Sequence, residues 1–232
     1  MGFAALLLIL FTSLGVWQVE RLSWKRELIT RVDARLAASA VAAPSSKEWA
    51  DLTRDTDEYR RVTISGKFLH EDETLVQAVT ELGGGYWVMT PLVTPEGSYQ
   101  INRGFVPSDH SDPASRSQGQ VQGRVTITGL IRISEPKGGF LRENDPAQGR
   151  WYSRDVGAIS ADIGVTTAPF FIDADATPNP GGYPIGGLTV VNFRNAHLSY
   201  ALTWFALAIG TLAASFLFGR HEWRQRRAWP GT

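Results

Sequence analysis

The sequence predicts a membrane protein in which two transmembrane helices flank a mainly antiparallel β domain, a sandwich or a barrel, outside the cytoplasm. Three observations predict this fold class. Each end of the chain carries an uncharged apolar run, apolar and polar residues alternate between these runs, and clusters of turn residues interrupt the alternation. We also expect an amphipathic helix directly after the first span.

The first span is residues 1–17, which carry no charged side chain. The run is slightly short for a hydrocarbon core about 30 Å thick, and a cleaved signal peptide is the alternative to an anchor. A signal peptide has a basic start and a small-x-small cleavage motif, and this run has neither. Trp17, Trp24 and several cations follow it, as at a membrane interface, which favours an uncleaved anchor.

Residues 18–43 are expected to form an amphipathic helix and a linker, because helix-forming residues dominate and apolar positions recur along one face. Pro44 disfavours helical geometry at the residue before it, so the helix ends by this point. Trp17, Arg21 and Trp24 form a separate stripe that faces the second span, a partner or the lipid interface. The apolar positions of the helix are Leu22, Leu28, Val32 and Leu36.

Residues 44–196 are expected to form the extracytoplasmic β domain. The strongest alternation lies between Arg124 and Ser134, where Ile131 belongs to the apolar face. One short helix, 158–163, and loops at 107–123 and 176–187 are also predicted. The predicted strands are 61–68, 73–80, 85–93, 98–105, 124–134, 150–156, 169–174 and 188–192.

The second span is residues 197–218, which have no charge from Leu198 to Phe218. This length suits a transmembrane helix better than a buried core helix. The tail, 219–232, carries four Arg against Glu222 alone, and short basic segments stay in the cytoplasm. We therefore expect a basic cytoplasmic tail and an external domain, although the cations just after the first span oppose this orientation.

Composition excludes several functions. The chain has no Cys, so disulfides, zinc ribbons, iron–sulfur clusters and thiol catalysis are ruled out. Lys and Arg, 23 together, balance 23 Asp and Glu, so no nucleic acid is expected as a partner. The two uncharged apolar runs make the lipid bilayer the expected partner. GxSxG, P-loop and GxGxxG motifs are absent, so we expect no enzyme. No residue pattern favours the remaining alternative, a tethered enzyme.

Two polar groups could carry chemistry in the β domain. Asp109, His110 and Asp112 could gather around a cation, but such residues are also ordinary in turns, and a turn is the favoured interpretation. Arg103 and Arg150 lie beside aromatic residues in predicted strands. We expect them to be outward-facing charges rather than stacked pairs.

The most informative segment is the start of the second span. His197, Tyr200, Ala201 and Trp204 have the spacing i, i+3, i+4 and i+7, so they share one helical face. Such a face could bind a flat lipophilic macrocycle, with His197 as the metal ligand, the two rings packed against the macrocycle and Ala201 leaving room. Polar and aromatic anchoring at the interface is the alternative, and the residue types alone favour it.

Six segments that follow one another along nearly the whole chain carry a family resemblance, namely LGVWQVERLSWKRELI, YRRVTISGKF, GGYWVMTPL, INRGFVP, GRWYSRDV and NFRNAHLSYALTWFALA. In this order they resemble the surfeit locus protein 1 family, membrane proteins that help to assemble cytochrome c oxidase. The resemblance implies two transmembrane helices around a domain that faces the periplasm or the intermembrane space. Longer members have charged residues before the first span, which this sequence lacks, so the sequence leaves open whether the true start is Met1 or lies upstream.

The resemblance also implies a role in maturing the oxidase subunit that holds heme a. Bacterial members bind heme a through a histidine near the start of the second span, with a tryptophan seven residues later, and these positions match His197 and Trp204. It thus implies heme a as a transient cofactor, the oxidase catalytic subunit and heme a synthase as partners, and the bacterial inner membrane as location. The alternative is a heme-free scaffold that stabilises a nascent oxidase subunit through its β domain.

Overall fold

The computed structural model describes residues 2–136, 138, 142–191 and 195–228. The chain divides into two compact units. The first, here called the helical unit, comprises residues 1–33 and 191–232, and the second, the β unit, comprises residues 34–190. Each unit is described separately.

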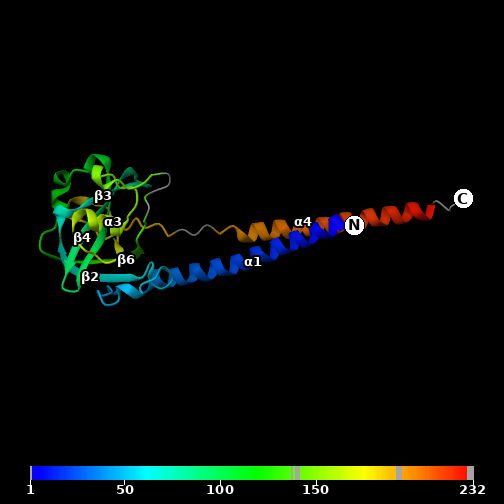
Figure 1. Ribbon diagram of the computed structural model, residues 1–232, viewed down its shortest axis with the longest axis horizontal. Helices are drawn as coiled ribbons and strands as arrows, with labels where there is room; N and C mark the ends of the chain where they lie inside the picture. Colours follow the sequence, from blue (N-terminus) through cyan, green and yellow to red (C-terminus); the bar gives the residue numbers. More distant parts are fainter. Residues whose placement is uncertain (1, 137, 139–141, 192–194, 229–232) are drawn as a thin grey trace. The chain divides into compact units, whose positions relative to one another are not determined.

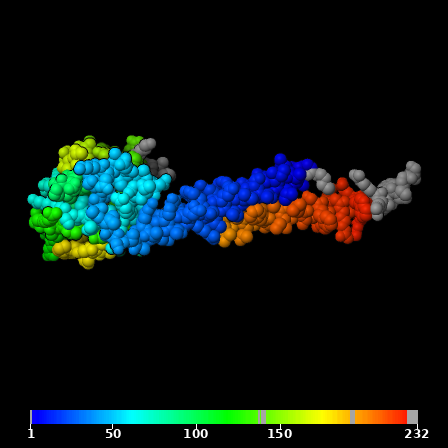
Figure 2. Space-filling view, turned by 90° about the horizontal axis from the view of Figure 1, so that it is seen from below, coloured from blue at the N-terminus to red at the C-terminus, as the bar shows by residue number. Residues whose placement is uncertain are grey.

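The helical unit is built from α1 (Gly2–Ala37) and α4 (His197–Ala228), which lie side by side (Figures 1 and 2). Both helices are long and apolar enough to cross a membrane. They run antiparallel, because Phe11 of α1 meets Trp204 whereas Gln18, later in α1, meets His197, earlier in α4. Because α1 runs without a break from Gly2 to Ala37, the first span and the expected amphipathic helix are one continuous helix.

A glycine lets the two helices approach closely. A Cβ on Gly15 would lie only 2.6 Å from the ring of Phe205, so any larger residue there would displace that ring. Small residues are typical of helix contacts in membranes, where close backbone approach maximises dispersion and the hydrophobic effect contributes little. Gly15 is buried together with Gln18 and Leu22, so this face of α1 is its packing face.

The described part of the β unit contains one seven-stranded sheet with the order β1-β2-β6-β7-β5-β4-β3. An additional pairing between β2 and β4 closes β2, β6, β7, β5 and β4 into a barrel, which decides between the two predicted architectures. Neighbouring strands are antiparallel except for β1 with β2 and β5 with β7. The strands are β1 (Val41–Ala42), β2 (Arg61–Phe68), β3 (Thr74–Thr80), β4 (Gly83–Thr94), β5 (Gly97–Pro107), β6 (Arg124–Ile133) and β7 (Phe170–Ala174).

Two short α-helices complete the β unit, α2 (Arg54–Asp57) and α3 (Val156–Ile163). The side chain of Asp155 accepts a hydrogen bond from the backbone N–H of Ala158, which caps the start of α3. The helix ends at Gly164, whose φ of 70° is a left-handed conformation that glycine adopts without strain. The predicted short helix is therefore confirmed, two residues longer at its start.

Two predicted strands are wrong. In 150–156, only Arg150 and Trp151 form isolated bridges, because Arg150 closes a tight turn with Asp145 through two backbone hydrogen bonds. Of the predicted strand 188–192, residues 188–191 form no strand. Thr189 is instead attached to the sheet by a hydrogen bond from its side-chain hydroxyl to Asp173. Asn192 lies outside the described residues.

The core has two clusters. The first fills the barrel with residues from β2, β4, β5, β6 and β7, including Ile131, which confirms the predicted inward face of that strand. The second lies beneath α3 and includes Trp151 and Phe171. Tyr99 in the first cluster donates a hydrogen bond to the carbonyl of Pro44 at 2.8 Å, which ties the segment before β2 to the barrel. Burial raises the pKa of the Tyr99 hydroxyl.

Candidate functional site

His197 is the first residue of α4, and its ring is held by α1. Its Nδ1 lies 2.8 Å from Oε1 of Gln18, which is buried. An amide oxygen only accepts hydrogen bonds, so Nδ1 is the donor in this contact, and Nε2 is the nitrogen that has a lone pair in the neutral imidazole. Histidines that ligate metals typically have this arrangement, in which a second group binds the other nitrogen and orients the ring. The geometry therefore suits His197 as an axial ligand.

The other predicted site residues differ in their surroundings. Ala201 is only 2% exposed, and it lies one turn before Phe205 on the face that packs on α1. The ring of Trp204 stacks on Phe11, with centroids 5.9 Å apart and planes at 24°. Tyr200 is 57% exposed. His197, Ala201 and Trp204 thus lie toward α1, and Tyr200 faces outward, while their roles toward a cofactor stay predictions.

The stripe of Trp17, Arg21 and Trp24 lies on another face of α1. Both indoles are about half exposed, and the guanidinium carbon of Arg21 lies 4.8 Å from the centroid of the Trp24 ring. The residues of α1 that are buried in the helical unit include Gly15, Gln18 and Leu22 instead. This stripe therefore does not face the second span, and a partner or the lipid interface remains as its neighbour.

Gln18 is the site residue that sequence reasoning missed. Gln18 lies three residues after Gly15 and four residues before Leu22, so helical spacing places all three on one face of the helix. A buried amide between apolar helices needs a hydrogen-bond partner. That signal is present in the sequence, but the identity of the partner is not.

The predicted orientation of Arg103 is wrong. It was expected to face outward, but it is only 2% exposed, and its guanidinium carbon lies 4.9 Å from the centroid of the Phe68 ring. Burial lowers the pKa of this guanidinium to about 10, although Glu73 favours its charged form. Glu73 also pairs with Arg116, so one buried carboxylate serves two guanidinium groups. Arg150, by contrast, faces outward as predicted and pairs with Asp145 at 2.6 Å.

The Asp109 to Asp112 loop has ordinary turn chemistry. Nδ1 of His110 lies 3.1 Å from the neighbouring Asp109 carboxylate, and Asp112 accepts a hydrogen bond from the backbone N–H of Ala114. Within the described residues, no group of three or more His, Asp or Glu side chains could hold a metal ion. The turn interpretation is therefore the one that the contacts support.

A buried polar cluster in the β unit centres on Asp173 of β7. Its carboxylate accepts hydrogen bonds from Asn102 at 2.8 Å, Arg132 at 3.0 Å, Arg154 at 3.2 Å and Thr189 at 2.8 Å. Sequence reasoning missed this cluster too. Its one signal is an acidic residue inside the short apolar strand FFIDA.

Comparison with known proteins gives matches over most of the chain. The profile of the SURF1 family matches residues 5–209. Surfeit locus protein 1 of Rattus norvegicus is 38% identical over 216 residues, which cover 85% of this chain and 68% of the rat protein. The SURF1-like protein of Monosiga brevicollis is 39% identical over 215 residues, 86% of this chain and 80% of that protein. Surfeit locus protein 1 of Homo sapiens is 38% identical over 217 residues, 85% and 70% of the two chains. With its two spanning helices, the chain is a two-pass membrane protein and belongs to the SURF1 family.

Proposed function

We propose that this chain is a non-enzymatic assembly factor for cytochrome c oxidase, which holds heme a through His197 and passes it to the oxidase catalytic subunit. Membership of the SURF1 family supports the assembly role, because the six segments that carry the resemblance are those of oxidase assembly proteins. A partnership with heme a synthase, as the source of heme a, belongs to the same proposal.

The observation that carries the heme proposal is the contact between His197 and Gln18. When bound, heme a would supply an iron, and the imidazole of His197 would hold it as a ligand. In this structure Gln18 occupies Nδ1 of His197, so Nε2 is the nitrogen that remains for such a bond. The exposed ring of Tyr200, one turn along α4, would pack beside the macrocycle. A single protein ligand suits a carrier, because a group held on one face leaves more readily than one held on both.

The proposed location is the bacterial inner membrane, with the β unit in the periplasm. The short tail after Phe218 is rich in Arg, and short basic segments are retained on the cytoplasmic side. Because the chain crosses the membrane twice, the residues between the two spans would lie on the side opposite to the cytoplasmic tail. The start of α4, where His197 lies, would be at the periplasmic end of its span.

Replacing His197 by Ala is expected to abolish heme a binding, because it removes the axial ligand. The test is to purify the full chain in detergent from cells that make heme a and to record its visible spectrum. We expect a Soret band in the unmodified protein and its loss in His197→Ala. His221→Ala is the matched control, since His221 lies near the other end of α4 and contacts Gln225.

An unmodified protein without a Soret band would contradict heme binding. So would a band that persists in His197→Ala or that disappears equally in His221→Ala. If oxidase assembly in membranes then still depended on the chain, the heme-free scaffold would be the correct interpretation.

Replacing Gln18 by Leu is expected to weaken heme a binding roughly tenfold or more, because loss of a group that orients a metal ligand typically costs 10- to 100-fold in affinity. Gln18→Glu keeps an acceptor oxygen at the same position and should retain more affinity than Gln18→Leu. Gln225→Leu removes the corresponding neighbour of His221 and should have no effect. Heme titration of the three purified variants measures the difference, and equal affinities would show that Gln18 does not orient the ligand.

A further inference from the structure

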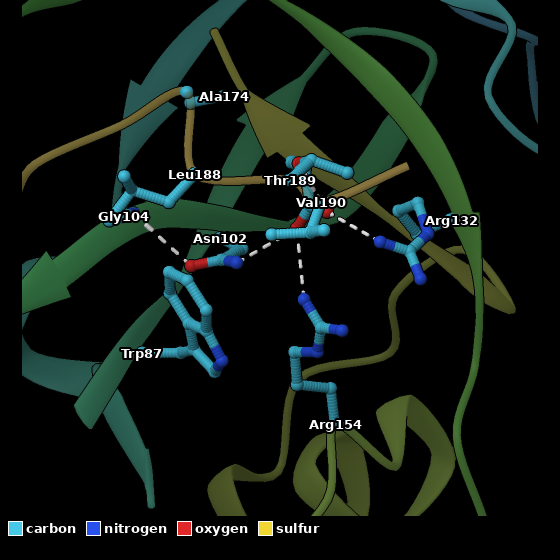
Figure 3. Close-up of a pocket in the computed structure, with 11 residues that line it drawn as sticks. Trp87, Asn102, Gly104, Arg132, Arg154, Ala174, Leu188, Thr189 and Val190 are labelled. Carbon is cyan, nitrogen blue, oxygen red and sulfur yellow. Dashed lines mark hydrogen bonds and ion pairs between the residues drawn. The ribbon is translucent and has the colours of Figure 1, made fainter. Parts of the chain in front are cut away.

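A cavity of about 210 Å³ lies in the β unit, beside the cluster around Asp173. Figure 3 shows Trp87, Asn102, Arg132 and Arg154 around it, with Val190 on the segment that follows β7. The proposed heme ligand belongs to the other unit, so this cavity is a separate feature of the chain. It is smaller than the roughly 300–1,000 Å³ of pockets that take drug-sized ligands, so it suits a small molecule.

The lining of the cavity has an excess of positive charge. Its ionisable residues are Arg132, Arg154 and Asp173, two cations against one anion. The carboxylate of Asp173 already accepts four hydrogen bonds, so it has little remaining capacity to accept more from a ligand. Glu135 pairs with Arg154 and lies 3.7 Å from Arg132, and Glu58 lies 3.6 Å from Arg132, but neither carboxylate lines the cavity. The surface that a ligand meets in the cavity therefore carries two guanidinium groups and one carboxylate.

Both guanidinium groups retain donors. A guanidinium has five N–H groups, and Arg154 makes two hydrogen bonds to Glu135 and one to Asp173. Arg132 makes one, to Asp173, and its buried Nε has no hydrogen-bond partner, since the nearest Glu58 oxygen is 3.6 Å away. Buried N–H groups without partners are costly, and the N–H groups that remain on the two guanidinium groups are the donors that an acceptor in the cavity would use.

The cavity also has an apolar, flat wall. The indole of Trp87 lies along it, with the guanidinium carbon of Arg154 5.8 Å from the ring centroid. Val190, which is 70% exposed, adds an aliphatic edge. A planar apolar group would stack on the indole while its acidic end reached the guanidinium groups.

We propose that this cavity binds a small monocarboxylate with a flat apolar body. The carboxylate accepts charge-assisted hydrogen bonds from Arg154 and Arg132, and the body packs on Trp87. This goes beyond the proposed assembly function and does not depend on heme, because every residue involved lies in the β unit.

The test measures binding of 4-fluorobenzoate to the full chain in detergent by fluorine NMR of the ligand. The uncharged analogue 4-fluorobenzamide is the control. We expect saturable binding of the carboxylate and at least tenfold weaker binding of the amide, because hydrogen bonds to a charged group are the stronger ones. Equal binding of the two compounds, or no binding of the carboxylate, would overturn the proposal.

Two pairs of variants locate the site. Arg154→Gln removes a charge from the cavity and should weaken 4-fluorobenzoate binding at least tenfold, whereas Arg150→Gln, at an exposed position that does not line the cavity, should not. Because Arg154→Gln also disturbs a buried ion pair, a second pair avoids the core. Val190→Glu should weaken binding severalfold by repulsion, and Val190→Gln should leave it unchanged. A pair whose members behave alike would contradict this location.

Discussion

Replacing Asp173 by Asn is expected to destabilise the β unit by about 3–5 kcal/mol, because breaking a buried ion pair leaves an uncompensated charge. The substitution leaves two mostly buried cations, Arg132 and Arg154, without the Asp173 carboxylate that they share. The Asp173 side chain is buried, and it accepts from Arg132 at 3.0 Å and from Arg154 at 3.2 Å. Asparagine has nearly the same shape, so the loss reports the charge and one acceptor oxygen rather than a cavity.

The measurement is thermal unfolding of the full chain in detergent, followed by near-ultraviolet circular dichroism. For a chain of this size, each kcal/mol shifts the melting temperature by roughly 2–4 °C, so we expect a decrease of at least about 6 °C. Asp175→Asn is the control, since Asp175 is partly exposed and lies 3.9 Å from Arg61, and such pairs contribute about 1 kcal/mol or less. Similar shifts in both variants would show that the Asp173 cluster is not a main source of stability.

Replacing Ile131 by Asp is expected to prevent the β unit from folding. Ile131 lies in the barrel core, fully buried. A carboxylate there has neither water nor a partner, and such a substitution costs well over about 4 kcal/mol, a large part of the total stability of a domain. We therefore expect loss of the folded protein from membranes, and with it loss of any assembly function.

Thr126→Asp is the matched control for this change. Thr126 lies on the same strand, β6, but is exposed, so a carboxylate there stays in water. Quantitative immunoblotting of membranes and limited proteolysis would compare the two variants. A protease-resistant Ile131→Asp protein at normal abundance would show that the barrel core tolerates charge, contrary to the packing described above.

Local patterns predict the strands well but not how they pair. The alternation in β6 correctly placed Ile131 in the core, because a period of two reports which face of one strand is buried. Barrel closure depends on Lys67 and Phe68 of β2 meeting Val93 and Leu92 of β4, a contact between segments about 25 residues apart. No local pattern encodes that contact, so sandwich and barrel could not be separated.

The same limit applies to charged residues. We expect Arg103 to face water because Arg usually does, but its burial depends on the carboxylate of Glu73, which is distant in the sequence. In the helical unit, helical spacing grouped His197 with Tyr200, Ala201 and Trp204, but only three of these four lie toward α1, because Tyr200 faces outward. It could not show that Gln18, 179 positions away, would hold the imidazole.

The Gln18 and His197 pair also sets the alignment of the two spans. Long apolar helices offer few features that distinguish one sliding position from the next, and a slip of one turn moves a helix by about 5.4 Å. Such a slip would separate the buried amide from the imidazole, and a buried polar group that loses its hydrogen-bond partner costs about 1–3 kcal/mol. The hydrogen bond between Gln18 and His197 therefore favours one alignment of α1 along α4. It also fixes the position of Nε2 of His197 along the helix axis.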